Sequence, residues 1–232
     1  MSTDFRLLVF DWDGTLMDSV SAIIACTRGA MVDAGLVPRP EAEIRRAIGM
    51  GLFDSFVMFY PGIAAEKYEQ VVESYRHHWL ATYKDHSTLF SGVRAALDEL
   101  TAQGYLLAVA TAKSRRGLER DLANTGLAGV IRASRTVDEA PPKPHPGMLA
   151  GLMGELGVDR DETLMIGDTT YDLDMARNAG TSAVGVLSGS HLETELLASE
   201  PLACLSGVAA LPEWLAARRP EAIAFEGSRS QA

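Results

Sequence analysis

Along most of the chain, short continuous runs of hydrophobic residues alternate with segments in which hydrophobic residues recur every three or four positions. Nearly continuous apolar runs that end at a polar residue are typical of strands buried in a parallel sheet. They predict strands at residues 6–11, 105–111, 163–166 and 181–186, with a weaker one at 129–133. Apolar residues three and four positions apart predict helices at 92–103, 114–125, 146–157 and 171–179. This alternation predicts an α/β fold, in which a parallel sheet is covered by helices on both faces.

Between the first and second strands the pattern is helical throughout. Helices are expected at residues 18–34, 41–48, 52–60 and 64–85, of which the last is the longest. A helical insertion of this size can form a small domain of its own. We therefore expect an α/β core at residues 1–17 and 87–218, a helical cap at 18–86 and a flexible polar tail at 219–232.

Composition and charge narrow the possible partners. The 232 residues carry a net charge of −10, which disfavours nucleic acid and anionic membranes but leaves room for a small anion where positive charge is local. Cys26 and Cys204 are too few for a disulfide framework and lack the spacing of zinc ligands. Since no signal peptide and no membrane-spanning apolar stretch is visible, we expect a cytoplasmic protein. The sequence carries no signal for an oligomeric state.

Two carboxylates follow the first strand directly. Its apolar run ends in the segment Asp11-Trp12-Asp13-Gly14-Thr15. In parallel α/β proteins, ligands bind in the crevice beyond the carboxyl ends of the strands. Two acids this close repel each other, which implies a bound cation, a shared proton or both. The alternative is an ordinary turn, since Asp and Gly are common turn residues.

Polar groups also follow the later strands. Thr111 ends the second strand just before a helix, and a hydroxyl beside the free amides of a helix start suits a phosphate. Lys143 lies in a segment with four prolines. Asp168 follows the strand at 163–166, and Asp172 comes one helical turn later on the same side. The ordinary alternatives are a helix cap for Thr111, a solvated loop position for Lys143 and a helix N-terminus for the two acids.

Taken together, these residues resemble the signatures of the haloacid dehalogenase superfamily, and specifically its phosphatases with a helical cap. The first signature, DxDGT followed by Leu or Val, matches residues 11–16. The others match, in chain order, Thr111, Lys143 with Pro144, and Gly167 with Asp168 and Asp172. The resemblance covers residues 6–217 and points most strongly to the phosphoglycolate phosphatase group. Ala112 departs from the pattern, because many relatives have Asn at that position.

The resemblance implies a Rossmann-like core and an Mg²⁺-dependent phosphatase. Asp11 would be the nucleophile that forms an aspartyl-phosphate, while Asp13 would protonate the leaving group and then deprotonate water. The Asp11 carboxylate, the Asp13 main-chain carbonyl and the Asp168 carboxylate would hold the Mg²⁺. Thr111 and Lys143 would hold the phosphate oxygens.

Supporting and substrate-binding residues follow from the same resemblance. Asp172 would orient the metal-bound waters or the lysine. The substrate would be a small phosphorylated metabolite, with 2-phosphoglycolate suggested by the group. Candidates for substrate contact are Thr15, Arg45, Gly49, Ala112 and Lys113. Further candidates are Arg46, His77, His78, Lys84 and, beside the lysine of the third signature, His145. Solvated helix faces are the ordinary alternative for those in the insert.

Three other functions stay open at this point. A sugar-phosphate mutase of the β-phosphoglucomutase type shares all four signatures but needs a second phosphate-holding site in the insert. A receiver-like domain also gathers Asp, Thr and Lys on a parallel sheet, although its acceptor Asp follows a middle strand. The third alternative is a binding module that kept the fold without catalysis.

Overall fold

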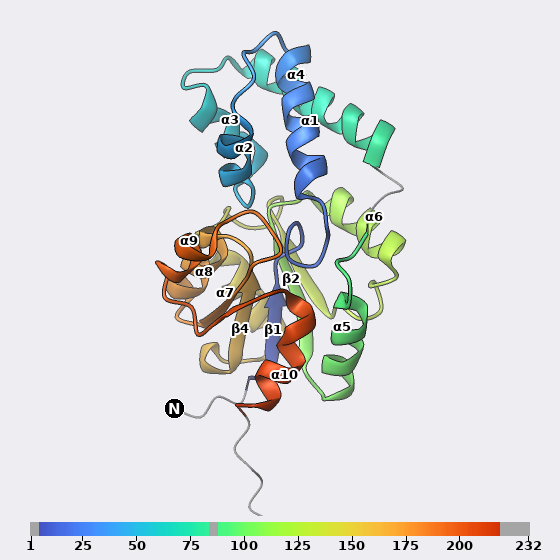
Figure 1. Ribbon diagram of the computed structural model, residues 1–232, viewed down its shortest axis with the longest axis vertical. Helices are drawn as coiled ribbons and strands as arrows, with labels where there is room; N and C mark the ends of the chain where they lie inside the picture. The colour runs from blue at the N-terminus through green and yellow to red at the C-terminus, as the bar shows by residue number, and fades with distance from the viewer. Residues whose placement is uncertain (1–4, 84–87, 219–232) are drawn as a thin grey trace, which may run out of the picture.

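Six parallel strands form the centre of the molecule, in the order β3-β2-β1-β4-β5-β6 (Figure 1). The computed structural model describes residues 5–83 and 88–218. The strands are β1 (Leu7–Phe10), β2 (Leu106–Thr111), β3 (Ala133–Thr136), β4 (Thr163–Gly167), β5 (Ser182–Val186) and β6 (Cys204–Leu205). β1 lies between two partners, because Leu7 is in register with Leu106 of β2 and with Thr163 of β4. This central position brings the end of β1 to the middle of one edge of the sheet.

Helices cover both faces of the sheet, which confirms the predicted Rossmann-like α/β fold. Successive residues of a strand point to opposite faces, so Leu8 and Phe10 join one buried cluster while Leu7 and Val9 join the other. The first face is covered by α5 (Val93–Ala102), α6 (Arg115–Thr125), η3 (Val208–Ala210) and α10 (Leu211–Ala216). The second is covered by α7 (Gly147–Leu156), α8 (Thr170–Ala179) and α9 (Glu193–Leu197).

The insert is helical and lies over the carboxyl ends of the strands, as Figure 1 shows. It consists of α1 (Val20–Asp33), α2 (Glu41–Ala47), α3 (Leu52–Phe59), α4 (Ala65–His78) and η1 (Trp79–Tyr83), a π-helical turn. The insert has a hydrophobic core of its own, which includes Met31, Phe56 and Val71. Two backbone hydrogen bonds tie its connections together, from Asp18 to Thr88 and from Phe90 to Leu16. The insert thus has a buried cluster of its own and joins the α/β core through two adjacent connecting segments.

Some elements differ from the prediction. The strand predicted at 129–133 is wrong, because the amides of Val130 and Ile131 bond to the carbonyl of Leu127 in a turn and β3 begins at Ala133. The helix predicted at 64–85 divides into α4 and η1, and its last two residues lie outside the described residues. β6, α9, α10 and the short 3₁₀ helix η2 (Arg160–Glu162) were not predicted. The boundary at residues 86 and 87 and the tail at 219–232 also lie outside the described residues.

Within the described ranges, every helix is too short or too polar to cross a membrane. Cys26, which is buried, and Cys204 are both free cysteines.

Candidate active site

The predicted polar residues meet at the carboxyl edge of the sheet. Asp11 follows β1, Thr111 ends β2 and Asp168 follows β4, and these three strands are neighbours. The chain passes from β1 to β2 and β3 on one side and returns to β4 on the other. The carboxyl end of β1 is therefore a topological switch point, where ligands bind in open α/β sheets.

Lys143 is buried between two carboxylates. Its Nζ lies 2.7 Å from Asp11 Oδ1 and donates to Asp172 Oδ1 at 2.6 Å. Burial alone would lower the pKa of Lys143, but the charges of Asp11 and Asp172 outweigh it and raise that pKa, so the ammonium stays protonated. The alternative of a solvated loop lysine is wrong, since the side chain is shielded from solvent.

Asp172 also caps the helix that it belongs to. Its Oδ2 accepts hydrogen bonds from the amide and the hydroxyl of Thr169, which forms a capping box at the start of α8. Its other oxygen holds Lys143. Asp172 therefore makes two kinds of contact: it stabilises a helix N-terminus and it accepts a hydrogen bond from the buried lysine.

Asp168 is held in a tight cradle. The hydroxyl of Thr15 donates to Asp168 Oδ1 at 2.7 Å, and the amide of Ser190 donates to Oδ2 at 2.8 Å. Gly14 turns the backbone with φ +86°, and a Cβ there would lie 2.4 Å from Asp168 Oδ2. A Cβ at Gly189 would lie 2.0 Å from the same oxygen. Thr15 is wholly buried, so its place as a substrate contact is corrected: its hydroxyl faces Asp168.

Among the described residues of this cluster, three carboxylates are matched by one ammonium, that of Lys143, and the excess negative charge fits a divalent cation. One oxygen from each of Asp11, Asp168 and Asp172 lies within 4.8 Å of the others. Burial raises the pKa of Asp11, and the neighbouring acids add to the rise. Burial, with Asp172, also raises the pKa of Asp168 to about 7. Because Asp172 already accepts three hydrogen bonds, the carboxylates of Asp11 and Asp168 are the more available to Mg²⁺, which prefers such oxygens.

Asp13 and Thr111 lie beside this cluster. Asp13 Oδ1 accepts a hydrogen bond of 2.7 Å from Ser19 and lies 3.3 Å from Lys113 Nζ. The Thr111 hydroxyl accepts from the amide of Lys113, while Ser114 caps α6 by accepting from the amide of Gly117. The alternative that Thr111 is the helix cap is therefore wrong. Lys113, a candidate substrate contact, is instead engaged with an acid of the site.

The residues proposed from the insert fall into two groups. Gly49 lies against the core, since a Cβ there would be 2.9 Å from Thr169 Oγ1. Arg46 pairs with Glu195 of α9 and so joins insert to core. Arg45 pairs with Glu41 on the exposed surface of its own helix, and its contact with substrate stays a prediction.

The histidine candidates are not brought to the acids. His77 is exposed, and His78 bonds to Asp33 within the insert. His145 is exposed, and its Nδ1 accepts from the amide of Gly147, so it does not join Lys143. Ala112, half-buried, lies between two residues that do belong to the site, and Lys84 lies outside the described residues.

Several residues of the site were missed from the sequence. Ser19, near the start of the helix predicted at 18–34, was not among the candidates, yet its hydroxyl donates to Asp13. The loop after β5 was not considered, although Ser188 donates to the carbonyl of Gly14 and Ser190 binds Asp168. The rule that strand ends share one edge would have pointed to this loop, because it follows a predicted strand.

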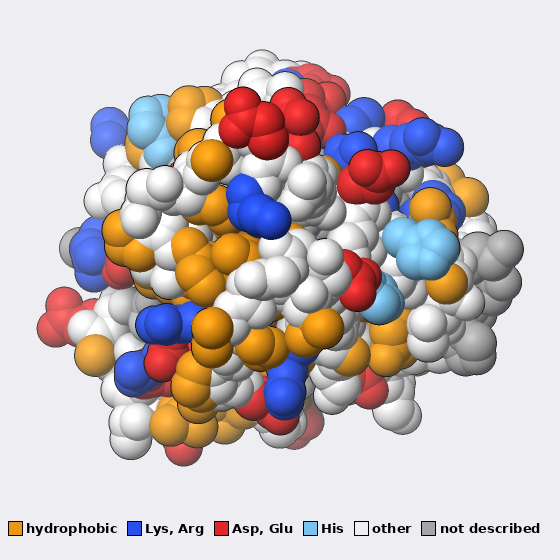
Figure 2. All heavy atoms as spheres, turned by 90° about the horizontal axis from the view of Figure 1, so that it is seen from above, with side chains coloured by type: hydrophobic (Ala, Val, Ile, Leu, Met, Phe, Trp, Pro, Cys, Tyr) orange, Lys and Arg blue, Asp and Glu red, His pale blue; other side chains and the backbone are white. Residues whose placement is uncertain are grey.

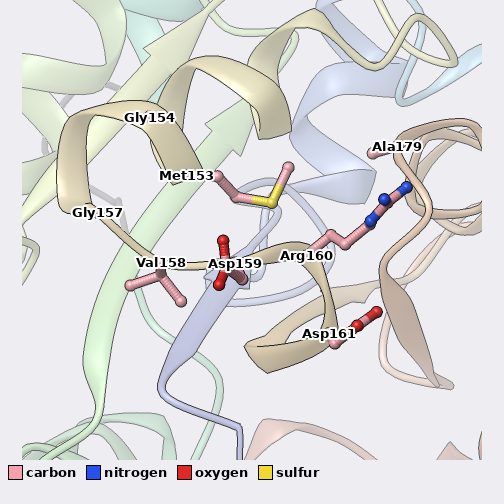
Figure 3. A pocket seen from close by; sticks show the side chains of 8 residues that line it. All are labelled: Met153, Gly154, Gly157, Val158, Asp159, Arg160, Asp161 and Ala179. Atoms are coloured by element: carbon pink, nitrogen blue, oxygen red, sulfur yellow. The ribbon is translucent and has the colours of Figure 1, made fainter.

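The surface of the insert and a hollow on the core are the remaining surface features. From above, over the insert, acidic, basic and hydrophobic side chains are interspersed (Figure 2). A hollow of about 630 Å³ lies between the end of α7 and η2, lined by Met153, Asp159 and Arg160 among others (Figure 3). It lies before the start of β4, whereas Asp168 follows the end of that strand. This hollow is therefore at the opposite edge of the sheet from the acids.

Comparison with known proteins places the chain in a family. A family model described as haloacid dehalogenase-like hydrolase matches residues 8–186. "Probable phosphatase IndB" of Dickeya dadantii (strain 3937) is 36% identical over 204 residues, which are 84% of this chain and 86% of that protein. "Phosphoglycolate phosphatase" of Haemophilus influenzae (strain 86-028NP) is 29% identical over 210 residues, covering 87% and 94%.

Solved structures agree with the sequence relatives. The crystal structure of a hydrolase from Pseudomonas syringae has a TM-score of 0.81 at 25% identity, covering 91% of this chain and 98% of that one. A chain from Bacteroides vulgatus whose name includes "beta-phosphoglucomutase" has a TM-score of 0.82 at 18% identity, covering 94% and 90%, which shows a shared fold alone. The predicted resemblance is thus confirmed, and the chain belongs to the haloacid dehalogenase-like hydrolases.

Proposed function

We propose that this hydrolase is an Mg²⁺-dependent phosphatase that hydrolyses a small phosphomonoester through an aspartyl-phosphate. The observation that carries the proposal is the buried Asp11, held by Lys143 and lying beside Asp168 and Asp172. The phosphatase names of the sequence relatives support it. A receiver-like domain is set aside by the family to which the chain belongs.

In this proposal Asp11 is the nucleophile and Asp13 transfers the protons. A carboxylate oxygen of Asp11 forms a bond to phosphorus as the ester P–O bond breaks, and the leaving alkoxide takes a proton from Asp13. Asp13 then removes a proton from water, whose oxygen bonds to phosphorus as the bond to Asp11 breaks. The products are an alcohol and inorganic phosphate, and both acids return to their starting state.

The other residues of the site would stabilise the negative charge of the phosphate and of Asp11. Lys143 and Thr111 would hold the non-bridging phosphate oxygens, and Lys143 also offsets the charge of Asp11. Asp11, Asp168 and the main-chain carbonyl of Asp13 would hold the Mg²⁺. When bound, the ion would offset the repulsion between a carboxylate nucleophile and a phosphate dianion.

Hydrolysis of p-nitrophenyl phosphate tests the proposal. The native protein should release p-nitrophenol with Mg²⁺ and not after removal of divalent metal, and Asp11→Asn should be inactive. Asp98→Asn is a matched control, because Asp98 pairs with Arg94 on the outer surface of α5. Absence of turnover by the native protein with every divalent metal tried would contradict the proposal.

The preferred substrate is part of the proposal, and 2-phosphoglycolate is the first candidate because of the Haemophilus influenzae relative. Values of kcat/KM for 2-phosphoglycolate, sugar phosphates and nucleotides should be highest for a small two-carbon ester. A hexose 1-phosphate should give free phosphate; faster formation of its isomer would favour the mutase alternative instead. We also propose a cytoplasmic location, which cell fractionation would test.

A further inference from the structure

Lys113 connects the acid Asp13 to the helical insert. Its Nζ lies 3.3 Å from Asp13 Oδ1, 3.1 Å from Asp121 Oδ2 and 4.7 Å from the centre of the Trp79 ring. The two acids belong to the core, whereas Trp79 begins η1 at the end of the insert. An ammonium has three protons, so it can serve two carboxylates and one ring face at once. Lys113 thus contacts both domains next to the proposed acid–base residue.

The surroundings fix Lys113 in this place. Asp121 is wholly buried on α6, and its other oxygen is bound by Arg120. Gly117 leaves room for the lysine stem, since a Cβ there would lie 3.0 Å from Lys113 Cγ. The side chain of Lys113 is only 12% exposed. Asp121 therefore anchors the ammonium from behind, and the ammonium can reach Asp13 without moving.

Trp79 meets Lys113 with its ring face and not with its N–H group. The indole Nε1 is buried, and the part of the chain that the structure describes offers it no hydrogen-bond partner. The ring stacks on Tyr75 with centroids 6.3 Å apart and an interplanar angle of 19°. A buried indole N–H normally finds a hydrogen-bond partner. Because no described residue holds this N–H, the ring is held by its stacking on Tyr75 and by its contact with the ammonium. The contact with Lys113 therefore depends on where the insert lies.

Within residues 5–83 and 88–218, the side-chain contacts of Asp13 converge on one oxygen. The Ser19 hydroxyl and the Lys113 ammonium both approach Oδ1. Proton transfer requires the carboxyl group to face the reacting oxygen within hydrogen-bond reach. With Oδ1 held from two sides, Oδ2 becomes the oxygen presented for proton transfer.

We propose that Lys113 is a positioning residue, which holds Asp13 in its proton-transferring orientation when Trp79 of the insert lies over the ammonium. Protonation of the leaving group is thereby coupled to docking of the insert on the core. This inference rests on the proposed phosphatase function and on the role given there to Asp13.

Two substrates with different leaving groups test the inference. Hydrolysis of 2-phosphoglycolate expels a strongly basic alkoxide that needs a proton, whereas p-nitrophenyl phosphate expels a weakly basic phenolate. The kcat/KM of each reports the steps up to loss of the alcohol. Lys113→Met should lower kcat/KM roughly 10- to 100-fold for 2-phosphoglycolate, because small misplacements of catalytic groups cost about that much, and less than about 3-fold for p-nitrophenyl phosphate. Trp79→Leu should also lower the ratio of kcat/KM for 2-phosphoglycolate to kcat/KM for p-nitrophenyl phosphate, but by a smaller factor than Lys113→Met.

Controls separate positioning from folding. Lys113→Met leaves Asp121 with one partner fewer, so the double variant Lys113→Met/Asp121→Asn removes the buried charge and should show the same change in ratio. Lys67→Met is the matched control, because Lys67 bonds to the carbonyl of Ala34 within the insert; its ratio should equal that of the native protein. If 2-phosphoglycolate is a poor substrate, the alkyl ester with the highest kcat/KM replaces it.

The outcomes distinguish this inference from the function on which it rests. Native turnover with an equal fall for both esters in the single and double variants would overturn the positioning role and leave the phosphatase intact. A native protein that hydrolyses neither ester would overturn the proposed function, and the inference with it. A loss confined to the alkyl ester supports both.

Discussion

Gly189 packs so closely on Asp168 that no side chain fits at that position. A Cβ there would lie 2.0 Å from Oδ2, 2.3 Å from Cγ and 2.5 Å from Cβ of Asp168. The shortest of these is roughly 1.5 Å below an ordinary contact between heavy atoms. Asp168 cannot swing aside, because Thr15 holds one of its oxygens and the amide of Ser190 holds the other. Gly189→Ala must therefore displace either the carboxylate or the loop that carries Ser190.

The expected size of this effect follows from the overlap. Forcing an extra methyl group into a packed site costs about 1–3 kcal/mol, which lowers the melting temperature of a protein of this size by roughly 2–12 °C. Disturbing the groups that orient a metal-binding carboxylate costs about 10- to 100-fold in metal affinity. Gly189→Ala should therefore need about 10- to 100-fold more Mg²⁺ for half-maximal hydrolysis of p-nitrophenyl phosphate.

A second glycine provides the control. A Cβ at Gly154, in α7, would meet nothing within 4 Å. Gly154→Ala should stabilise the protein by about 0.5–1 kcal/mol through helix propensity and leave the Mg²⁺ requirement unchanged. Mg²⁺ titrations of the two variants and the native protein, with thermal unfolding of each, make the comparison. A native Mg²⁺ requirement in Gly189→Ala would refute the assignment of Asp168 to the metal.

Other predictions concern pH and the insert. Burial raises the pKa of Asp168 to about 7 from the ordinary 3.8, so the metal-free protein binds more protons folded than unfolded and should lose stability as the pH rises between these values. A constant Mg²⁺ concentration, set at about 100 times the Kd at pH 8, should stabilise the protein by about 2.7 kcal/mol at pH 8 and by less at pH 5, where a proton competes for Asp168; equal shifts of the melting temperature at the two pH values would contradict this. Arg46→Ala removes an exposed ion pair to Glu195 and should change the free energy of unfolding by less than about 1 kcal/mol; a larger loss in denaturant unfolding would show that the pair does more. Phe56→Ala empties the buried core of the insert and should cost about 3–5 kcal/mol, seen as faster hydrogen exchange in α1 and α4 with the sheet still protected; equal acceleration throughout would show that the insert is no separate unit.

The sequence predicted the central part of the fold because burial leaves a clear pattern there. β1, β2, β4 and β5 are buried on both faces, so their apolar runs are nearly continuous. β3 pairs on one side only and reads Ala-Ser-Arg-Thr, so its pattern is weak, while nearby Val130 and Ile131 are apolar but lie in a turn. Edge strands are predicted poorly for this physical reason.

The acids of the site were predictable because each follows a strand. Asp11, Asp13 and Asp168 needed only the rule that parallel strands end at one edge. Contacts between residues distant in the chain were not predictable: Thr15 and Asp168 are 153 residues apart, and Ser188 and Gly14 are 174 apart. Such pairs depend on how loops pack after the sheet has formed, which leaves no local pattern in the sequence.

Trapping the covalent intermediate is the most direct test of the central claim, that Asp11 is the nucleophile. Acid quenching after milliseconds of reaction with p-nitrophenyl phosphate and Mg²⁺, followed by reduction of any acyl phosphate and peptide mass analysis, locates the modified side chain. Asp13→Asn should accumulate the intermediate, because the residue that removes a proton from water is gone. We predict modification of Asp11 in the native protein and in Asp13→Asn. A protein that hydrolyses the ester with no modification at Asp11, or with modification elsewhere, would contradict the account.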